Sequence, residues 1–266
     1  MTATFVVVPQ WQGSPSSRAM RQADGAAAIR GDLPSAATRE VAVPLEAGDE
    51  QSTGVARFSS LQLVRERMRD VLDEVTDTPI VVGGDCGVSA AAVMHAAEKH
   101  GDLAVIWFDA HPDLNDVESS PSGAYAGMVL RSIVDDGIVP AGRVLLVGAR
   151  SWDPGEEAFA VEAGIRSFSV DELADATALV AAVAETGAQS VYLHIDLDVL
   201  DPGEIAGLLD PEPFGLAASS LVAAVKALRG PFVLAGATIA AYAPASPAET
   251  VDDAPTILRI IGALAS

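Results

Sequence analysis

Three short polar segments of the chain carry side chains that could bind metal ions. They are GGDC at 83–86, DAHPD at 109–113 and DLD at 196–198, and each follows a short apolar run. Together they supply six side chains of the metal-ligand type: Cys86, Asp109, His111, Asp113, Asp196 and Asp198. Four carboxylates in one site would repel one another strongly unless cations lay between them. The pattern therefore predicts a pair of divalent metal ions, and such a pair commonly serves to activate water.

The spacing within these segments favours one shared site. Asp109, His111 and Asp113 alternate along the chain, so in an extended segment their side chains project to the same side. Asp196 and Asp198 have the same spacing. A carboxylate has two oxygens, and we expect Asp109 or Asp196, or both, to bridge two metals. A single aspartate in such a place is more often a turn or cap residue, but the three segments jointly favour a metal site.

Alternating strand-like and helix-like stretches predict the fold that would position these segments. Strand-like runs lie at 5–9, 79–84, 103–108, 143–148, 165–170, 190–195 and 231–236. Helix-like stretches lie near 58–75, 88–100, 126–137, 172–186, 217–229 and 253–265. Most of the runs are apolar at consecutive positions, as in strands buried on both faces of a parallel sheet. The alternation predicts a single doubly wound α/β domain over residues 1–266, with 11–55 forming loops and one short helix.

Composition and charge narrow the classes of function. Half of the 266 residues are hydrophobic, and the formal net charge is −21. This charge argues against nucleic acid and anionic membranes as partners. It suits metal ions and cationic small molecules, although many proteins are acidic for solubility alone. The lone cysteine excludes an internal disulfide and no apolar run approaches the ~20 residues of a membrane span. The N-terminal MTATFVVVPQ is typical of a first strand and not of a signal peptide, so we expect a cytoplasmic protein.

The three motifs together resemble those of the arginase, or ureohydrolase, family. That family carries GGDH, DAHxD and DxDxxDP, where this chain has GGDC, DAHPD and DLDVLDP between about residues 80 and 250. The resemblance implies an arginase-type sheet and two Mn²⁺ ions with a bridging hydroxide that attacks a guanidine-type carbon. It assigns the first ion to Cys86, Asp109, Asp113 and Asp196. It assigns the second ion to Asp109, His111, Asp196 and Asp198. Asp113 and His111 are also expected to take part in catalysis.

Further matches concern the amino acid end of a substrate. Asn115 in DAHPDLN and Ser122 in SPSGAYAG fall on family residues that contact a substrate α-carboxylate. GARSWDPGE resembles the family segment whose acidic residues hold the α-amino group, which implies Asp153 and Glu156. A free α-amino acid end favours an arginine-like substrate over agmatine. The alternative for each residue is an ordinary turn or cap.

Two departures from the family pattern affect the metal site and its proton transfer. Cys86 stands where the family usually has histidine, and a thiolate would make the first ion a poorer Lewis acid. Its alternative is a small buried thiol that does not touch metal. Ala126 falls where the family has its acid/base histidine. No other histidine is an obvious substitute, because His95, His100 and His194 are predicted to be structural.

A third departure concerns recognition of the guanidinium group. Ala241 in IAAYAP aligns with the family glutamate that binds the guanidinium. One interpretation is natural divergence, with Asp210 or Glu249 compensating. The other, which the near match to IAEYAP favours slightly, is an inactivating Glu→Ala change that leaves a chain able to bind substrate but barely to hydrolyse it.

These departures favour a substrate that is easier to hydrolyse than arginine. An N-hydroxyguanidine is much less basic than a guanidine, and its oxygen can ligate a metal or carry a proton. The combination of Cys86 and Ala126 resembles the branch of the family that hydrolyses Nω-hydroxy-L-arginine in D-cycloserine biosynthesis, which implies hydroxyurea and L-ornithine as products. The alternatives are an ordinary arginase, agmatinase or formimidoylglutamase, or a binding homologue without catalysis.

Two further expectations concern assembly and the metal. We expect a monomer, because the chain stops almost directly after the helix-like stretch at 253–265. Four carboxylates and a histidine suit manganese, whereas the cysteine suits iron, cobalt or zinc.

Overall fold

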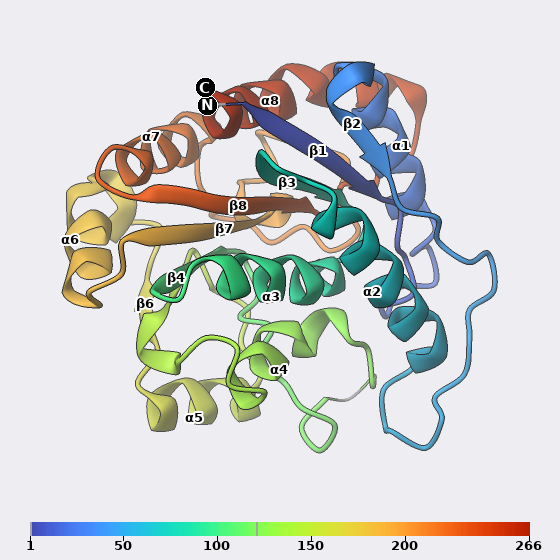
Figure 1. Ribbon diagram of the computed structural model, residues 1–266, viewed down its shortest axis with the longest axis horizontal. Coiled ribbons are helices and arrows are strands. Elements are labelled where there is room, and N and C mark those ends of the chain that lie inside the picture. The colour runs from blue at the N-terminus through green and yellow to red at the C-terminus, as the bar shows by residue number, and fades with distance from the viewer. Residues whose placement is uncertain (1, 121) are drawn as a thin grey trace.

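The computed structural model describes residues 2–120 and 122–266, and it contains one eight-stranded parallel sheet with helices on both faces (Figure 1). The strands are β1 (Ala3–Val8), β2 (Thr38–Glu40), β3 (Thr78–Gly83), β4 (Leu103–Phe108), β5 (Val144–Val147), β6 (Arg166–Phe168), β7 (Ser190–Asp196) and β8 (Val233–Ala240). Their order is β2-β1-β3-β8-β7-β4-β5-β6, and every neighbouring pair is parallel. This is the doubly wound α/β class that the sequence predicts.

Two hydrophobic cores cover the two faces of this sheet. The helices are α1 (Arg21–Gly31), α2 (Phe58–Asp73), α3 (Ser89–Lys99), α4 (Val129–Asp135), α5 (Pro154–Ala163), α6 (Thr177–Glu185), α7 (Ala218–Arg229) and α8 (Pro247–Ala265). Short 3₁₀ helices are η1 (Ser35–Ala37), η2 (Cys86–Val88), η3 (Ala126–Met128), η4 (Ala141–Arg143), η5 (Glu172–Ala174) and η6 (Leu197–Val199). Apolar residues of α1, α6, α7 and α8 form one core, and those of α2, α3, α4 and α5 form the other. Successive strand residues such as Val81 and Val82 point into opposite cores, which explains why the strands are apolar at consecutive positions.

The expected elements are present, and two further ones were missed. All seven predicted strands form, but the prediction for 11–55 was incomplete because it contains β2 as well as α1. The residues of β2 are half-buried or exposed at the edge of the sheet, so it has no apolar run. Helix α5 was missed because its sequence is weakly amphipathic and begins with Pro154 and Gly155, which are typical of a turn, and α8 begins at Pro247 instead of near 253. In the described chain, no helix combines the length and the apolar character of a membrane span.

The register of the central strands brings the three polar segments together. Phe108 pairs with Ile195, and Ile195 pairs with Ile239, which in turn pairs with Val82. The strand ends of β3, β8, β7 and β4 therefore lie at about one level. The segments that follow them share the carboxyl edge of the sheet, where open α/β folds bind their ligands.

Candidate metal centre and substrate cavity

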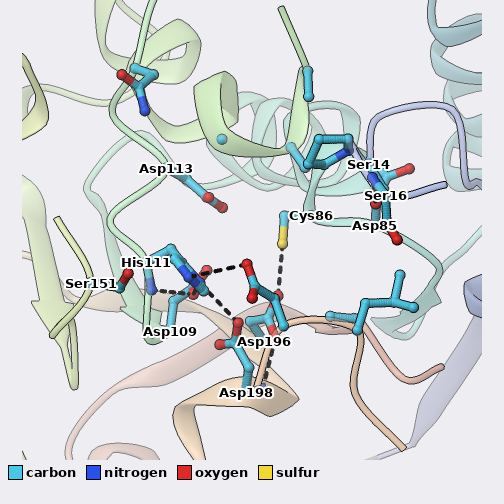
Figure 2. Close-up of a pocket in the computed structure, with 18 of the residues that line it drawn as sticks. Ser14, Ser16, Asp85, Cys86, Asp109, His111, Asp113, Ser151, Asp196 and Asp198 are labelled. Carbon is cyan, nitrogen blue, oxygen red and sulfur yellow. Dashed lines mark hydrogen bonds and ion pairs between the residues drawn. The ribbon is translucent and has the colours of Figure 1, made fainter. Parts of the chain in front are cut away.

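A cavity of about 600 Å³ opens at this carboxyl edge. Its lining includes all ten residues that the sequence predicts as ligands or substrate contacts: Cys86, Asp109, His111, Asp113, Asn115, Ser122, Asp153, Glu156, Asp196 and Asp198. Figure 2 shows Cys86, Asp109, His111, Asp196 and Asp198 converging on one region, with Asp113 approaching from the opposite side. The structure thus places the predicted site residues around one space, while their roles there stay predictions.

The DAHPD segment turns sharply after β4. The Asp109 carboxylate is almost fully buried, and it accepts hydrogen bonds from the His111 backbone N–H at 2.7 Å and the Trp107 indole N–H at 3.1 Å. Asp113 has a φ of 53°, in the left-handed region that residues with a Cβ seldom adopt. Its Oδ2 atom is buried and has no hydrogen-bond partner. A buried oxygen without a donor is costly unless a cation or a ligand completes it.

The DLD segment is fixed by similar local hydrogen bonds. Asp196 Oδ1 accepts from the Asp198 backbone N–H at 2.8 Å, and Asp196 Oδ2 lies 2.9 Å from the Cys86 thiol, which donates to it. Asp198 Oδ1 accepts from the Ala110 backbone N–H at 3.0 Å, and Asp198 Oδ2 lies 2.9 Å from His111 Nδ1 (Figure 2). These bonds tie the ends of β3, β4 and β7 to one another.

The GGDC segment is held by its third residue, Asp85. The Asp85 carboxylate accepts hydrogen bonds from the Gln10 side chain and from the backbone N–H groups of Gly13 and Gly87, each at 2.9 Å. A Cβ at Gly84 would collide with the Gln10 carbonyl oxygen, so only glycine fits there. Asp85 therefore fixes the backbone that presents Cys86, a role that sequence reasoning missed.

Two groups of ligand atoms lie close enough together to hold a cation. The first group is Cys86, Asp109, His194 and Asp196, and the second is Asp109, His111 and Asp198; within each group the ligand atoms lie within 4.8 Å of one another. Asp113, predicted as a ligand of the first ion, belongs to neither group but faces them across the cavity.

His194 belongs to the first group but is not among the residues that line the cavity. Its ring stacks on Trp107 with centroids 3.5 Å apart, and its Nδ1 lies 2.8 Å from the Ser89 hydroxyl. Its Nε2 is buried without a hydrogen-bond partner, 3.7 Å from Asp109 Oδ2. Burial lowers the pKa of His194, so this ring is neutral, with Nε2 turned toward Asp109.

The electrostatics of the cluster fit a pair of divalent cations. Burial, together with the neighbouring carboxylates, raises the pKa of Asp113 and Asp196 well above the usual range, and it raises the pKa of Asp198 to about 6. Burial and Asp196 raise the pKa of the Cys86 thiol. Burial disfavours the charged form of His111, but hydrogen bonds to Asp109 and Asp198 outweigh it and raise the pKa of His111 to about 12. The upward pKa shifts of the carboxyl groups and the thiol come first from burial and then from the crowding of negative charge, and bound cations would offset both.

The predicted substrate residues line the same cavity. Asn115 Nδ2 donates to Asp153 Oδ2 at 2.9 Å, and Asn115 Oδ1 is buried without a partner. Ser122 is exposed, and its hydroxyl accepts from the Ala124 backbone N–H at 3.2 Å. Glu156 accepts from the backbone N–H groups of Asp153 and Leu114 at 2.9 and 3.0 Å. Both of its oxygens are thus engaged by the protein, and this favours a role for Glu156 in holding the segment over direct contact with a ligand.

The two alanines that replace family side chains also line the cavity. Ala126 stands in η3, and among the residues known to line the cavity His111 is the only histidine. Ala241 follows β8 with a φ of 66°, and its backbone N–H donates to the Gly84 carbonyl oxygen at 2.7 Å. Left-handed conformations outside glycine cluster at functional sites. A longer side chain at 241 would extend from the wall of this cavity.

Sequence reasoning missed several residues of the cavity wall, among them Gln22 and Leu208. Gln22 lies in the weakly patterned region 11–55, which offers no motif, and Leu208 lies in an irregular loop. From the sequence, Asp210 is considered only as a residue that could compensate for the family glutamate that Ala241 replaces. It lines the cavity with its carboxylate 3.9 Å from His111 Nε2, and Glu212 lies at the same distance.

Fold and site together define an α/β protein with an acidic cluster suited to two cations at the carboxyl edge of a parallel sheet. The chain belongs to the Arginase family, whose model matches residues 15–261. It is 33% identical to arginase of Bacillus subtilis over 168 residues, which cover 57% of this chain and 56% of that protein. It is 30% identical to guanidinopropionase of Pseudomonas aeruginosa over 203 residues, which cover 74% of this chain and 63% of that protein. The matches thus span less than two thirds of these relatives.

Solved structures confirm the fold over the whole chain. Arginase of Entamoeba histolytica in complex with L-ornithine superimposes with a TM-score of 0.85 at 22% identity, covering 99% of this chain and 98% of that one. Proclavaminate amidino hydrolase of Streptomyces clavuligerus superimposes with a TM-score of 0.77 at 20% identity, covering 99% of this chain and 92% of that one. The arginase-type sheet predicted from the motifs is therefore confirmed.

Proposed function

We propose that this protein is a binuclear-metal hydrolase that cleaves Nω-hydroxy-L-arginine to hydroxyurea and L-ornithine. The observation that carries the proposal is the pairing of Cys86 and Ala126 in the wall of one cavity, where the family pattern has two histidines. The general class has separate support, because the relatives include an arginase, a guanidinopropionase and an amidino hydrolase. The names of the last two refer to a guanidino compound and to an amidino group, and arginine, to which the first name refers, carries a guanidino group.

The two cations would be divided between the two ends of the cluster. Cys86, Asp109, Asp113 and Asp196 would hold the first ion. Asp109, His111, Asp196 and Asp198 would hold the second ion. When bound, two divalent ions supply an activated water and polarise the carbon that it attacks. Manganese is the metal proposed, since oxygen ligands and one imidazole suit it.

The thiol at position 86 changes the charge balance of the centre. Four aspartates and one thiolate carry five negative charges against four positive ones from two divalent ions, whereas a histidine at 86 would give an even balance. The richer donor set lowers the acidity of bound water. A substrate that is neutral near pH 7 and easily attacked, such as an N-hydroxyguanidine, tolerates this better than the cationic guanidinium of arginine.

Proton transfer to the leaving amine falls to Asp113 in this proposal. Water adds to the guanidino carbon, the bond from that carbon to the δ-nitrogen breaks, and the δ-nitrogen takes up a proton as ornithine leaves. Asp113 Oδ2 is buried, has no hydrogen-bond partner and lies in the cavity wall, so it is placed to take a proton from the attacking water and pass it to the δ-nitrogen. His111 is less suited to this proton transfer, because its Nδ1 faces Asp198.

The amino acid end of the substrate would lie against Asn115, Ser122 and Asp153. Asn115 keeps one free N–H on Nδ2 for a carboxylate, and its unpartnered Oδ1 can accept from an ammonium group beside Asp153. Glu156 would act through Asp153, whose backbone it binds. Asp153→Ala should raise the KM for Nω-hydroxy-L-arginine about fivefold and leave any turnover of a guanidino compound that lacks an α-amino group much less affected.

The proposal is tested by measuring ornithine release from Nω-hydroxy-L-arginine and from L-arginine, with manganese, for this chain and for Ala241→Glu. Selective turnover of the hydroxylated compound, much stronger after Ala241→Glu, is the expected result, and it would identify Ala241 as an inactivating residue. Turnover of arginine alone would place the chain with the ordinary arginases.

A second candidate is a homologue that binds metal and ligand without hydrolysis. Ala126 and Ala241 favour it, because both remove side chains of the family's catalytic pattern from the cavity wall. Full metal content in Ala241→Glu together with no turnover of any guanidino compound would favour this candidate over the hydrolase.

A further inference from the structure

Gln22 is a buried polar residue of the cavity wall whose amide has no assigned task. It lies in the first turn of α1, the residue is 5% exposed, and it lines the cavity that holds the acidic cluster. Its Oε1 atom is buried without a hydrogen-bond partner. A buried carboxamide oxygen without a donor is destabilising, so its presence at a cavity wall indicates that a ligand supplies the donor.

The packing of α1 brings its first turns against the segment that follows Ala241, which lines the same cavity as Gln22. Gly25, one turn further along α1, lies directly against Tyr242, since a Cβ at Gly25 would collide with the Tyr242 carbonyl oxygen. Arg21 Nε donates to the Pro244 carbonyl oxygen at 3.1 Å. These two contacts fix the first turns of α1 on the segment that follows Ala241, and residues three apart on a helix share a face.

The other buried glutamines show that the missing partner is particular to Gln22. Gln10 Nε2 donates to Asp85 at 2.9 Å. Gln12 Nε2 donates to the Pro44 carbonyl oxygen at 2.8 Å, and Gln12 Oε1 accepts from the Trp11 backbone N–H at 3.1 Å. Gln10 and Gln12 therefore hold the protein together, whereas Gln22 presents its amide to the main cavity.

We propose that Gln22 is a specificity-determining residue that binds the guanidine-type head of the substrate. The inference rests on the proposed function for the identity of that head. Oε1 would accept from an N–H or O–H of the head, and Nε2 could donate to the oxygen of an N-hydroxyguanidine. A neutral amide does not select for a cation, unlike a carboxylate, whose bonds to cations are charge-assisted. Gln22 thus suits a neutral hydroxylated head better than the guanidinium of arginine.

The test is calorimetric binding of Nω-hydroxy-L-arginine, L-arginine and L-ornithine to the manganese-loaded protein and to its Gln22→Met variant. Methionine keeps the length of the side chain and removes both polar groups. We expect Gln22→Met to weaken binding of Nω-hydroxy-L-arginine about tenfold and to leave ornithine, which has no guanidine-type head, unchanged. Because an unpaired polar atom is removed, the Tm of the ligand-free protein should stay constant or rise.

Gln12→Met is the matched control. It should lower the Tm, since it removes hydrogen bonds to the half-buried backbone of Trp11 and Pro44, and it should not alter the ratio of the three affinities. Unchanged affinity for Nω-hydroxy-L-arginine in Gln22→Met, or a fall in Tm with an equal loss for all three ligands, would overturn the inference. If the parent chain binds ornithine but neither guanidino compound, the proposed function itself fails and the inference falls with it.

Discussion

The two ends of the cavity are built differently. At the strand-end cluster of Asp109, Asp196 and Asp198, each carboxylate accepts a backbone N–H from a nearby residue, so its position is fixed before any ligand arrives. At the end near Gln22 and Ala241, a carboxamide lacks a partner and a small residue occupies a left-handed conformation. The cluster end is organised by the protein itself, whereas the other end is completed by what binds. We infer that the first end provides reactivity and the second provides selectivity.

The largest effect should come from removing a shared carboxylate at the cluster end. Asp196→Ala, made together with Ala241→Glu so that turnover can be followed, should abolish binding of at least one metal ion and reduce kcat about a thousandfold, or about 4 kcal/mol. Metal content by mass spectrometry of the purified protein checks the first part. Asp252→Ala, an exposed position on α8, is the control and should change neither quantity. Retention of two ions in Asp196→Ala would exclude Asp196 as a bridging ligand.

The second largest effect should come from a change at Ala241, in the end of the cavity that we infer to provide selectivity. Ala241→Glu should raise turnover of Nω-hydroxy-L-arginine about a hundredfold, about 3 kcal/mol, because a carboxylate can orient the head of the substrate. Ala241→Gln supplies a side chain of the same length without the charge, and it should raise this turnover much less. An equal rise in turnover for both variants would show that the cavity wall at position 241 lacks side-chain size and not charge.

Manganese itself should stabilise the cluster end in a pH-dependent way. The pKa of Asp198 is raised to about 6, above its unfolded value near 3.9, so the metal-free native state keeps a proton that the unfolded state has lost. Stability of the metal-free protein should therefore fall as the pH rises from about 4 to about 6. Metal must displace these protons, so its binding strengthens over the same range.

At one hundred times its Kd, manganese should contribute about 2.7 kcal/mol of stability. The rise in Tm on adding a fixed manganese concentration should be larger at pH 7 than at pH 5, and thermal unfolding with and without chelator measures it. Magnesium at the same concentration is the control, because it is reluctant to exchange its waters for a protein cage. An equal rise at both pH values would show that the cluster carboxylates are not the ligands.

The same contrast explains what could be predicted from the sequence. The cluster follows apolar strands and its residues alternate, so both the parallel sheet and the shared edge could be predicted from local pattern. Gln22 could not be predicted, because its place in the wall depends on the packing of Gly25 against Tyr242, two residues far apart in the chain. The edge strand β2 was missed for a similar reason, since its pairing with β1 and not its own apolarity makes it a strand.

The smallest predicted effect tests whether the cluster end also contributes to selectivity. Cys86→His, made in the Ala241→Glu background, restores an even charge balance and should make bound water more acidic. The ratio of kcat/KM for L-arginine over Nω-hydroxy-L-arginine should then rise about tenfold, about 1.4 kcal/mol. Cys86→Ser is the control, since it keeps the size of the side chain but weakens the donor. If Cys86→His binds two manganese ions with an unchanged ratio, the electronic argument is wrong, and selectivity then lies wholly with the end of the cavity near Gln22 and Ala241.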